Sequence, residues 1–514
     1  MTCCTSPLRA LLFLFIFPAF VIPLHAADAA PADCQYHQLA TLPLRYTGPG
    51  LSLTIEGRID GTPADMLVDT GATSSMLTRT ATARRGLSLS PSNERMRGIG
   101  GYSRVYTTRI REFQAGPAGI RNSRVRVIGD MGFEPSFDAI LGAHFLLQTD
   151  FEIVLASKEV RFFKPSNCKK AMLAYWDPDA VEIPFDTGFS RHPSPYFKVL
   201  LNGKEIIAMI DSGAATSVVT RKAVERAGLS LDALGAQQIP SAAGIGSGRV
   251  ARWGAILPLL QIGRETIHNA DLGVIETEDL DVDLLLGADF LRAHRVLFAM
   301  SQRKLYISYV GGAPFGQRRT LEPWLQQEAD AGNGDAQLAL ASIHARGLGV
   351  PRDAAAARSW IDRAAAGGNP RAMLQLGQHL QREEKHADAI VHLRAALARM
   401  PTERFGALWL YAARMRSGDA ELARRELEAT FARDGEDDWP RPIAEFYLGK
   451  LDEPRLLALA RKDRSSARAR ACQAGFHIAE HHRLAGAPER AAQALRDIPE
   501  CRVTPPKPAQ DADT

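Results

Sequence analysis

The segment Met66–Ala72, with the sequence Met-Leu-Val-Asp-Thr-Gly-Ala, has a close copy at Met209–Ala214, with the sequence Met-Ile-Asp-Ser-Gly-Ala. In each copy an apolar run is followed by an aspartate, a hydroxyl residue and a glycine. A short apolar run predicts a buried strand, and the residues after it favour a tight turn. We therefore expect two buried strands that each deliver one carboxylate, Asp69 or Asp211, to a turn.

The similarity extends well beyond these two turns. A hairpin-turn dipeptide, Asp60-Gly61 in one copy and Asn202-Gly203 in the other, precedes each aspartate at the same spacing. Further along, Asp138–Leu146 matches Asp283–Leu291, and both contain two apolar residues followed by Gly-Ala. Self-similarity over this length indicates that one structural unit occurs twice.

The composition changes along the chain and predicts several domains. At 514 residues the chain is too long for one hydrophobic core. Residues 40–310 contain short alternating stretches separated by Gly, Asn and Pro, which are typical of β-structure. Beyond about residue 318, Ala, Leu, Arg and Glu dominate and apolar residues recur at helical spacing. We predict a multidomain protein, in which an all-β two-lobed domain precedes an all-α helical-repeat solenoid.

The predicted boundaries follow from these changes. They are a signal peptide at 1–29, β lobes at 35–170 and 175–312, helical repeats at 318–501, and a disordered tail at 502–514. The tail is polar and rich in proline, which is typical of segments that do not fold.

Two carboxylates can hydrolyse a peptide bond without a metal ion or a cofactor. When they lie close together both cannot be ionised, so they share one proton. The ionised member takes a proton from water, and the protonated member polarises the scissile carbonyl group. Thr70 and Ser212 can stiffen the turns by bonding to backbone, while Gly71 and Gly213 let two loops approach without a Cβ clash. The two aspartates are therefore the predicted catalytic residues.

A third copy of the tripeptide, Asp186–Gly188, has a different context. It follows Pro184-Phe185, precedes Phe189 and has no partner in the repeat. We interpret it as a loop before the first hairpin of the second lobe, on the basis of its turn-forming residues.

Two glycine-rich segments follow the acidic turns at similar distances. The flap and substrate-binding candidates are Gly98, Ile99 and Gly100 in the first copy, and Gly244, Ile245 and Gly246 in the second. A mobile hairpin tip could close over a bound peptide and exclude water. The alternative is an ordinary hairpin loop. Neither segment has the strand-to-helix context of a dinucleotide-binding loop.

Together these segments resemble the retropepsin-like aspartic peptidases. Met66–Ser75 and Met209–Ser217 resemble their active-site signature, and Ile140–Gly142 and Leu285–Gly287 resemble the apolar-apolar-Gly turn late in each lobe. The resemblance covers about residues 40–310. It implies an aspartic-protease-like domain made of two small β-barrels, a cleft between them, and endopeptidase activity through water without a cofactor. Retropepsins are homodimers, so two unequal lobes in one chain depart from their pattern.

The region after residue 318 resembles Sel-like repeats, which are relatives of the tetratricopeptide repeat. Gly334–Leu338 opens a predicted helix, and Gly347–Asp353 separates it from a second helix. Looser tetratricopeptide-type helices follow at Ala387–Leu397 and Gly418–Leu427. Stacked helix pairs of this kind form a concave binding face. The region is predicted either to recruit a protein partner or substrate, or to be a structural appendage that covers the β domain.

The N-terminus has the order of a secretory signal peptide. Arg9 precedes an uncharged apolar run, Ala10–Leu24, and small residues follow, so cleavage after Ala26 or Ala29 fits equally well. The alternative is a membrane anchor, but the run is short for a span and contains two prolines. We expect an exported protein, periplasmic or secreted, with no stable membrane span after cleavage.

The number of cysteines and the net charge bear on disulfides, metal binding and nucleic-acid binding. Four cysteines follow the signal peptide, and an even count in an oxidising compartment suggests disulfides. The predicted pairs are Cys34 with Cys168 and Cys472 with Cys501, and the alternative is buried free thiols. They lack the supporting histidine spacing of a zinc site, so no metal is predicted. The small net charge of +4, without basic runs interleaved with aromatics, gives no reason to expect nucleic acid.

The sequence therefore predicts an exported aspartic endopeptidase that acts on peptides or proteins. One alternative is a non-catalytic peptide-binding or adaptor protein that retains the protease fold. A third hypothesis is that each lobe pairs with a lobe of another chain.

Overall fold

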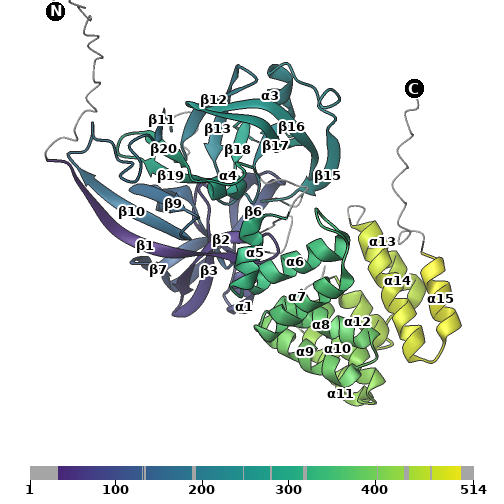
Figure 1. Cartoon of the computed structure of the whole chain (residues 1–514). Coiled ribbons are helices and arrows are strands. Elements are labelled where there is room, and N and C mark those ends of the chain that lie inside the picture. Colours follow the sequence, from purple (N-terminus) through teal and green to yellow (C-terminus); the bar gives the residue numbers. More distant parts are fainter. Residues whose placement is uncertain are drawn as a thin grey trace, which may run out of the picture.

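The computed structural model describes residues 33–129, 131, 135–187, 193–246, 248–277, 280–315, 321–401, 403–432, 439–462 and 466–498. The predicted signal peptide at 1–29, Gly188, Cys501 and the predicted tail at 502–514 lie outside these ranges. Within them, none of the helices has the length and apolar character needed to cross a membrane. Two β lobes are followed by a helical region (Figure 1).

The first lobe is built almost entirely from strands. Its strands are β1 Gln35–Thr47, β2 Ser52–Ile59, β3 Thr62–Val68, β4 Met76–Thr78, β5 Ser90–Gly98, β6 Gly101–Ala115, β7 Ala118–Ile128, β8 Ala139–Leu141, β9 Asp150–Val154 and β10 Glu159–Ser166. Two short helices complete it, α1 Arg79–Arg84 and α2 Ala143–Leu146. Alternation of buried and exposed residues along β2 explains why one face of its sheet packs inward.

The second lobe repeats this plan. Its strands are β11 Val181–Pro184, β12 Tyr196–Leu201, β13 Lys204–Ile210, β14 Val218–Thr220, β15 Gln237–Ala242, β16 Val250–Ile262, β17 Glu265–Ile275, β18 Leu284–Leu286, β19 His294–Ala299 and β20 Lys304–Tyr309, with helices α3 Arg221–Arg226 and α4 Ala288–Ala293. The order β12-β13-β18-β14-β17-β16-β15 matches β2-β3-β8-β4-β7-β6-β5 strand for strand. Each sheet also closes on itself, through β2 with β6 and β12 with β16.

A six-stranded segment of the thirteen-stranded sheet joins the two lobes. Its order is β11-β20-β19-β9-β10-β1, so three strands come from each half of the β region. At its centre, Phe151 of β9 is paired with Phe298 of β19 in antiparallel register. The carboxylate of Asp150, which is fully buried, accepts hydrogen bonds from the backbone and hydroxyl of Ser301, both at 2.9 Å. Backbone pairing and buried polar contacts therefore hold the lobes in a fixed relation.

The helical region contains eleven helices among the described residues. They are α5 Pro323–Asp330, α6 Gly334–Arg346, α7 Ala354–Ala366, α8 Pro370–Arg382, α9 His386–Arg399, α10 Arg404–Arg416, α11 Ala420–Phe431, α12 Arg441–Tyr447, α13 Glu453–Arg461, α14 Ala467–Leu484 and α15 Pro488–Arg496. Asn333 and Asn369 cap α6 and α8 in the same way, because each side chain accepts two backbone N–H groups of the first turn. Most helices pack chiefly against their neighbours in sequence.

The start of the helical region is anchored to the first lobe (Figure 1). Gly48 donates its backbone N–H to Asp335 at 2.6 Å, and Asn333 donates to the carbonyl of Tyr46 at 3.0 Å. Lys158 forms an ion pair with Glu328 at 2.9 Å. These contacts place the N-terminal end of the helices directly beside β1.

Candidate active site

Asp69 and Asp211 each follow an inner strand of their lobe. Strand β3 runs parallel to β8, and Asp69 donates its N–H to the carbonyl of Leu141 at 3.1 Å. The second lobe repeats this contact, because β13 runs parallel to β18 and Asp211 donates to Leu286 at 2.9 Å. Strands β8 and β18 therefore fix the position of the aspartate backbone at the end of β3 and β13.

The two carboxyl groups meet at the interface between the lobes. Each carboxyl group lies against the turn of the other lobe, because a Cβ atom on Gly71 would be 2.4 Å from the carboxyl carbon of Asp211, and one on Gly213 would be 2.4 Å from that of Asp69. Asp69 Oδ1 also accepts the backbone N–H groups of Gly71 at 3.0 Å and Ala72 at 2.7 Å. On the other side, Asp211 Oδ1 accepts the N–H of Gly213 at 2.9 Å. Each turn thus directs its own carboxylate toward that of the other lobe.

The environment of this pair favours a shared proton. Burial raises the pKa of Asp69 well above its usual range, and the nearby carboxylate of Asp211 raises it further. Burial also raises the pKa of Asp211, but a hydrogen bond from the backbone of Gly213 and another from Asp69 work against that rise. The two carboxyl groups therefore titrate as a pair that retains one proton between them.

Thr70 and Ser212 interlock beneath the carboxylates. Thr70 Oγ1 donates to the carbonyl of Ile210 at 2.7 Å and accepts the N–H of Ser212 at 3.1 Å. The reciprocal bonds run from Ser212 Oγ to the carbonyl of Val68 at 2.7 Å, and from the N–H of Thr70 to Ser212 Oγ at 3.1 Å. Both side chains are almost completely buried. Both of these predicted support residues thus bond to the opposite lobe.

A hydroxyl group supports the late turn of each copy, but only the second copy adds a carboxylate. Ser217 Oγ accepts the N–H of Gly287 at 2.9 Å and donates to Asp289 at 2.6 Å. In the first lobe, Ser75 Oγ accepts the N–H of Gly142 at 3.1 Å. The residue equivalent to Asp289 is there the exposed His144. The two halves of the site are therefore similar but unequal.

The two glycine-rich hairpin tips touch each other. Gly100 donates its N–H to the carbonyl of Ile245 at 2.8 Å, and Gly248 donates to the carbonyl of Gly100 at 2.9 Å. A Cβ atom on Gly98 would lie 2.4 Å from Cβ of Ile245, which shows how closely the tips approach. The β5–β6 and β15–β16 hairpins therefore form a continuous bridge from one lobe to the other.

Each tip places an isoleucine on the opposite lobe. Ile99, from the first lobe, packs against the cluster that contains Met209 of the second lobe. Ile245, from the second lobe, packs against the cluster that contains Leu67 of the first lobe. Because Leu67 and Met209 lie on the strands that end at Asp69 and Asp211, both tips lie next to the strands that carry the site.

Sequence reasoning missed Ser194, which supports the first acidic turn. The hydroxyl of Ser194 is fully buried and donates to the carbonyl of Thr70. Ser194 precedes β12 in the Pro-Ser-Pro sequence of residues 193–195, and no motif marks it.

The third copy of the tripeptide lies outside the site. Asp186 forms an ion pair with Arg303 at 2.7 Å, and its side chain is 53 % exposed.

Cys34 and Cys168 form a disulfide that links the start of β1 to the segment after β10. The second predicted pair, Cys472 with Cys501, extends beyond the described ranges at Cys501. In those ranges, no group of three His, Cys, Asp or Glu side chains is arranged to hold a metal ion.

Both halves of the β region match models of known families. Residues 55–145 match a family described as aspartyl protease, and residues 197–293 match one described as a gag-polyprotein putative aspartyl protease. The β region therefore contains two aspartyl-protease-like domains. The first of these domains contains Asp69 and the second contains Asp211, at equivalent positions in each.

Two curated relatives and one solved structure are similar to parts of this chain. The chain is 28 % identical over 131 residues to DNA damage-inducible protein 1 of Saccharomyces cerevisiae, a match that covers 24 % of this chain and 27 % of that protein. It is 31 % identical over 123 residues to the protein of the same name from Kluyveromyces lactis, covering 24 % and 28 %. The chain thus spans only about a quarter of the length of these relatives. The aspartic proteinase from Irpex lacteus is similar with a TM-score of 0.35 at 11 % identity, covering 54 % of this chain and 99 % of that one.

Proposed function

We propose that the chain is an exported aspartic endopeptidase whose catalytic dyad is Asp69 and Asp211. The observation that carries this proposal is the close approach of two carboxyl groups, one from each aspartyl-protease-like domain, each held against the Asp-Thr-Gly or Asp-Ser-Gly turn of the other domain. Burial makes the pair retain one proton, which gives an acid and a base at a single point. Two carboxyl groups in these states are sufficient to activate water.

The proposed reaction proceeds in two steps. In the first, Asp211 takes a proton from water, whose oxygen bonds to the scissile carbonyl carbon, while Asp69 gives its proton to the carbonyl oxygen. The product is a tetrahedral diol, and the two aspartates have exchanged protonation states. In the second, Asp211 protonates the leaving nitrogen as the C–N bond breaks, and Asp69 takes back a proton from a hydroxyl of the diol. The dyad returns to its starting state.

The experiment that tests this function compares three asparagine variants on a peptide library at several pH values. Asp69→Asn and Asp211→Asn are each expected to lower cleavage by at least about 10²-fold, because each removes the acid or the base. Asp186→Asn is the matched control, since this aspartate heads the same tripeptide but pairs with Arg303 at 2.7 Å. Equal cleavage by the wild type and the dyad variants would reject the proposal and favour a non-catalytic peptide-binding protein.

An inhibitor gives a second readout that does not require a known substrate. A pepstatin-type compound places a hydroxyl between the two carboxyl groups of a shared-proton dyad. Wild-type protein is expected to bind it, and Asp69→Asn is expected to bind it far more weakly. Binding that is unchanged in this variant would mean that the compound does not contact the dyad.

Export is proposed from the sequence and is supported by one structural contact. The apolar run Ala10–Leu24 has the order of a signal peptide, and the Cys34–Cys168 disulfide is of the kind that persists in oxidising compartments. Expression of the full-length chain followed by fractionation and N-terminal sequencing tests this. Cleavage after Ala26 or Ala29 is the expected result, and an uncleaved cytoplasmic protein would contradict it.

We also propose that the helical region recruits protein partners or substrates. The anchoring of α5 and α6 on the first lobe would keep a recruited protein near the cleft. This role predicts that a preferred protein substrate is cleaved with a lower KM than the short peptide that spans its cleavage site. Equal KM values for the protein and the peptide would instead favour a purely structural role for the helices.

A further inference from the structure

Two arginines face each other across the β6–β7 hairpin of the first lobe. Arg109 and Arg124 are directly opposite in the antiparallel register, and both are exposed. No ion pair joins either guanidinium group to a carboxylate in the part of the chain that the structure describes. Like charges at directly opposite positions destabilise a sheet. The hairpin therefore carries a concentration of positive charge that opposes its own stability.

The second lobe provides an internal comparison for this pair. The β6–β7 and β16–β17 hairpins turn at Gly116 and Gly263, with φ of 58° and 59°. At the same distances from these turns as Arg109 and Arg124, the second lobe has Ile256 and Asp271, which also pair in register. The fold thus accepts an apolar residue and an acid at these positions. The paired arginines are therefore specific to the first lobe, and the hairpin shared by the two lobes does not require them.

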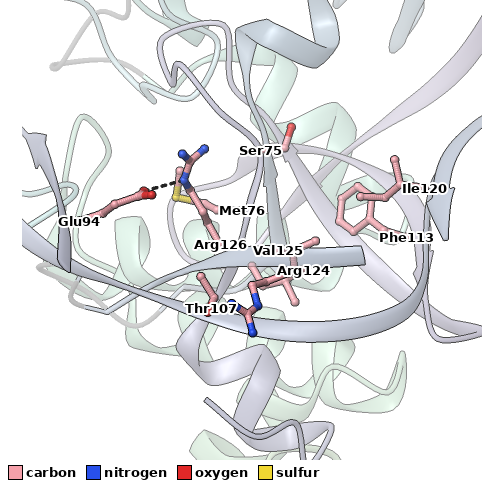
Figure 2. A pocket seen from close by; sticks show the side chains of 10 residues that line it. Ser75, Met76, Glu94, Thr107, Phe113, Ile120, Arg124, Val125 and Arg126 are labelled. Carbon is pink, nitrogen blue, oxygen red and sulfur yellow. Dashed lines mark hydrogen bonds and ion pairs between the residues drawn. The ribbon is translucent and has the colours of Figure 1, made fainter. Parts of the chain in front are cut away.

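A cavity of about 450 Å³ lies beside Arg124, the β7 member of this pair. Arg124 and Arg126 line it from β7, as Figure 2 shows, and Ser75 and Met76 line it from the segment that follows the Asp69 turn. Arg126 is paired with Glu94 at 2.8 Å, whereas Arg124 has no such ion pair within the described residues. Apolar side chains form much of the remaining lining. The cavity therefore combines an apolar wall with an available positive charge.

We propose that Arg109, Arg124 and this cavity form an exosite for an acidic segment of a polypeptide substrate. This inference rests on the proposed peptidase function, because the exosite would hold a part of the substrate outside the cleft. Ser75, which lines the cavity, follows Gly71 on the segment that leaves the Asp69 turn. Glu94 and Thr107 line it from the β5–β6 hairpin, which also carries the first glycine-rich tip. These two segments connect the surroundings of the Asp69 turn to the cavity.

The chemistry of this site suits carboxylates that lie next to an apolar side chain. Guanidinium groups bind carboxylates with paired, charge-assisted hydrogen bonds, and an apolar wall accommodates the hydrocarbon part of a neighbouring side chain. A segment with several acidic residues around one apolar residue satisfies both features. An anionic membrane surface would meet the exposed arginines but would leave the cavity unfilled, so it is an outcome of the test and not the proposal.

Two variants and one control isolate the contribution of the pair. Arg109→Gln with Arg124→Gln removes both charges, and Arg109→Ile with Arg124→Asp transplants the pair found in the second lobe. Both are expected to fold at least as well as the wild type, because a like-charge pair is removed. Lys169→Gln with Lys170→Gln is the matched control, since it removes two exposed charges from the same lobe.

The probe is a synthetic peptide that carries several glutamates around one leucine, with a counterpart in which glutamine replaces each glutamate. Wild type and control are expected to bind the glutamate peptide more tightly than the glutamine peptide, and added salt should weaken this preference. The Arg109→Gln/Arg124→Gln variant should bind the glutamate peptide roughly tenfold more weakly. The transplanted pair should weaken binding further, because it adds a negative charge.

Three results would overturn the exosite. They are equal binding of both peptides by the wild type, unchanged affinity in both arginine variants, and arginine-dependent binding to anionic phospholipid vesicles by a protein that does not bind the glutamate peptide. Binding is measured without turnover and can be repeated with Asp69→Asn. The contribution of the arginines to peptide binding can therefore be measured even in a protein that lacks peptidase activity. Failure of the exosite and failure of the proposed peptidase are therefore distinguishable.

Discussion

The carboxyl carbon of Asp69 lies so close to Gly213 that a Cβ atom on residue 213 would be 2.4 Å from it. The reciprocal relation holds between Gly71 and Asp211, where the corresponding distance is also 2.4 Å. The glycine of each turn is therefore required by the carboxylate of the other lobe. A side chain at either position would displace one member of the dyad from its partner.

The first prediction is that Gly213→Ala inactivates the protein while leaving it folded. The new methyl group must push Asp69 aside, and small displacements of reacting groups cost about 10²-fold in rate. We expect kcat to fall by roughly that factor, with an intact circular dichroism spectrum. Gly50→Ala is the control, because its nearest neighbour would be 3.8 Å away. Similar kcat values for Gly213→Ala and Gly50→Ala would contradict this account of the turn.

The second prediction concerns the interlocked hydroxyl groups. Thr70→Val keeps the shape of the side chain but leaves the carbonyl of Ile210 and the N–H of Ser212 without their partner. An unpaired buried polar group costs about 1–3 kcal/mol, so we expect the free energy of unfolding to fall by about 2–4 kcal/mol. Urea denaturation measures the change. Thr70→Ser retains the hydroxyl, and equal losses for the serine and valine variants would show that the hydrogen bonds are not responsible.

The duplicated plan of the β region could be predicted because its signals are local. The apolar run before each aspartate, the hairpin dipeptides and the late apolar-apolar-Gly turns all recur at matching positions, and the strand orders of the two sheets agree. The pairing of β3 with β8 lets the strand before the late turn position Asp69, because Leu141 accepts the N–H of Asp69 at 3.1 Å. Sequence spacing indicated the turns but did not indicate this bond.

Contacts between segments far apart in the chain could not be predicted from the sequence. The six-stranded segment that joins the lobes pairs β9 with β19, and neither strand carries a motif that identifies its partner. Ser194 likewise donates to Thr70 from a loop without a recognisable signal. The crossing of Ile99 and Ile245 onto opposite lobes depends on where two hairpins end in space. Such features follow from tertiary packing, which local periodicity does not encode.

The third prediction is a bell-shaped dependence of activity on pH. Activity falls on the acidic side when Asp211 gains a proton, and burial raises its pKa above the usual 3.8 of an aspartate. It falls on the alkaline side when Asp69 loses its proton, and burial raises that pKa well above 3.8. We therefore expect the maximum of kcat to lie above about pH 4. Highest activity below the usual pKa of an aspartate would contradict the assigned environment of the dyad.

The same pKa values predict how stability depends on pH, which is the fourth prediction. Since the pKa of Asp69 is higher in the folded protein than in the unfolded chain, the folded state binds the proton more tightly. Its stabilising contribution is complete below about pH 4 and is lost as pH rises through the raised pKa. As pH rises above about 4, the wild type should therefore lose more stability than Asp69→Asn, which has no proton to lose at this position. Parallel stability curves for the two proteins would contradict this linkage.

The fifth prediction is that the crossed isoleucines hold the hairpin tips together. Ile99→Ala and Ile245→Ala each remove part of a contact with the opposite lobe, at a cost of about 1–2 kcal/mol for a partly buried side chain. A loss of that size makes local opening about tenfold more frequent. The N–H groups of Gly100 and Gly248, which cross between the tips at 2.8 Å and 2.9 Å, should therefore exchange with deuterium about tenfold faster.

Hydrogen exchange at these two amides separates a local effect from general destabilisation. Leu39→Ala is the control, because Leu39 lies on β1 and is 51 % exposed, and it should leave both tips unchanged. Amides of the central sheet, such as those of β9, should exchange at wild-type rates in all variants, since their protection depends on global unfolding. If the tip amides keep their rates in both isoleucine variants, the backbone bonds alone hold the tips closed. Opening for substrate would then depend on breaking the Gly100 contacts and not on withdrawing the isoleucines.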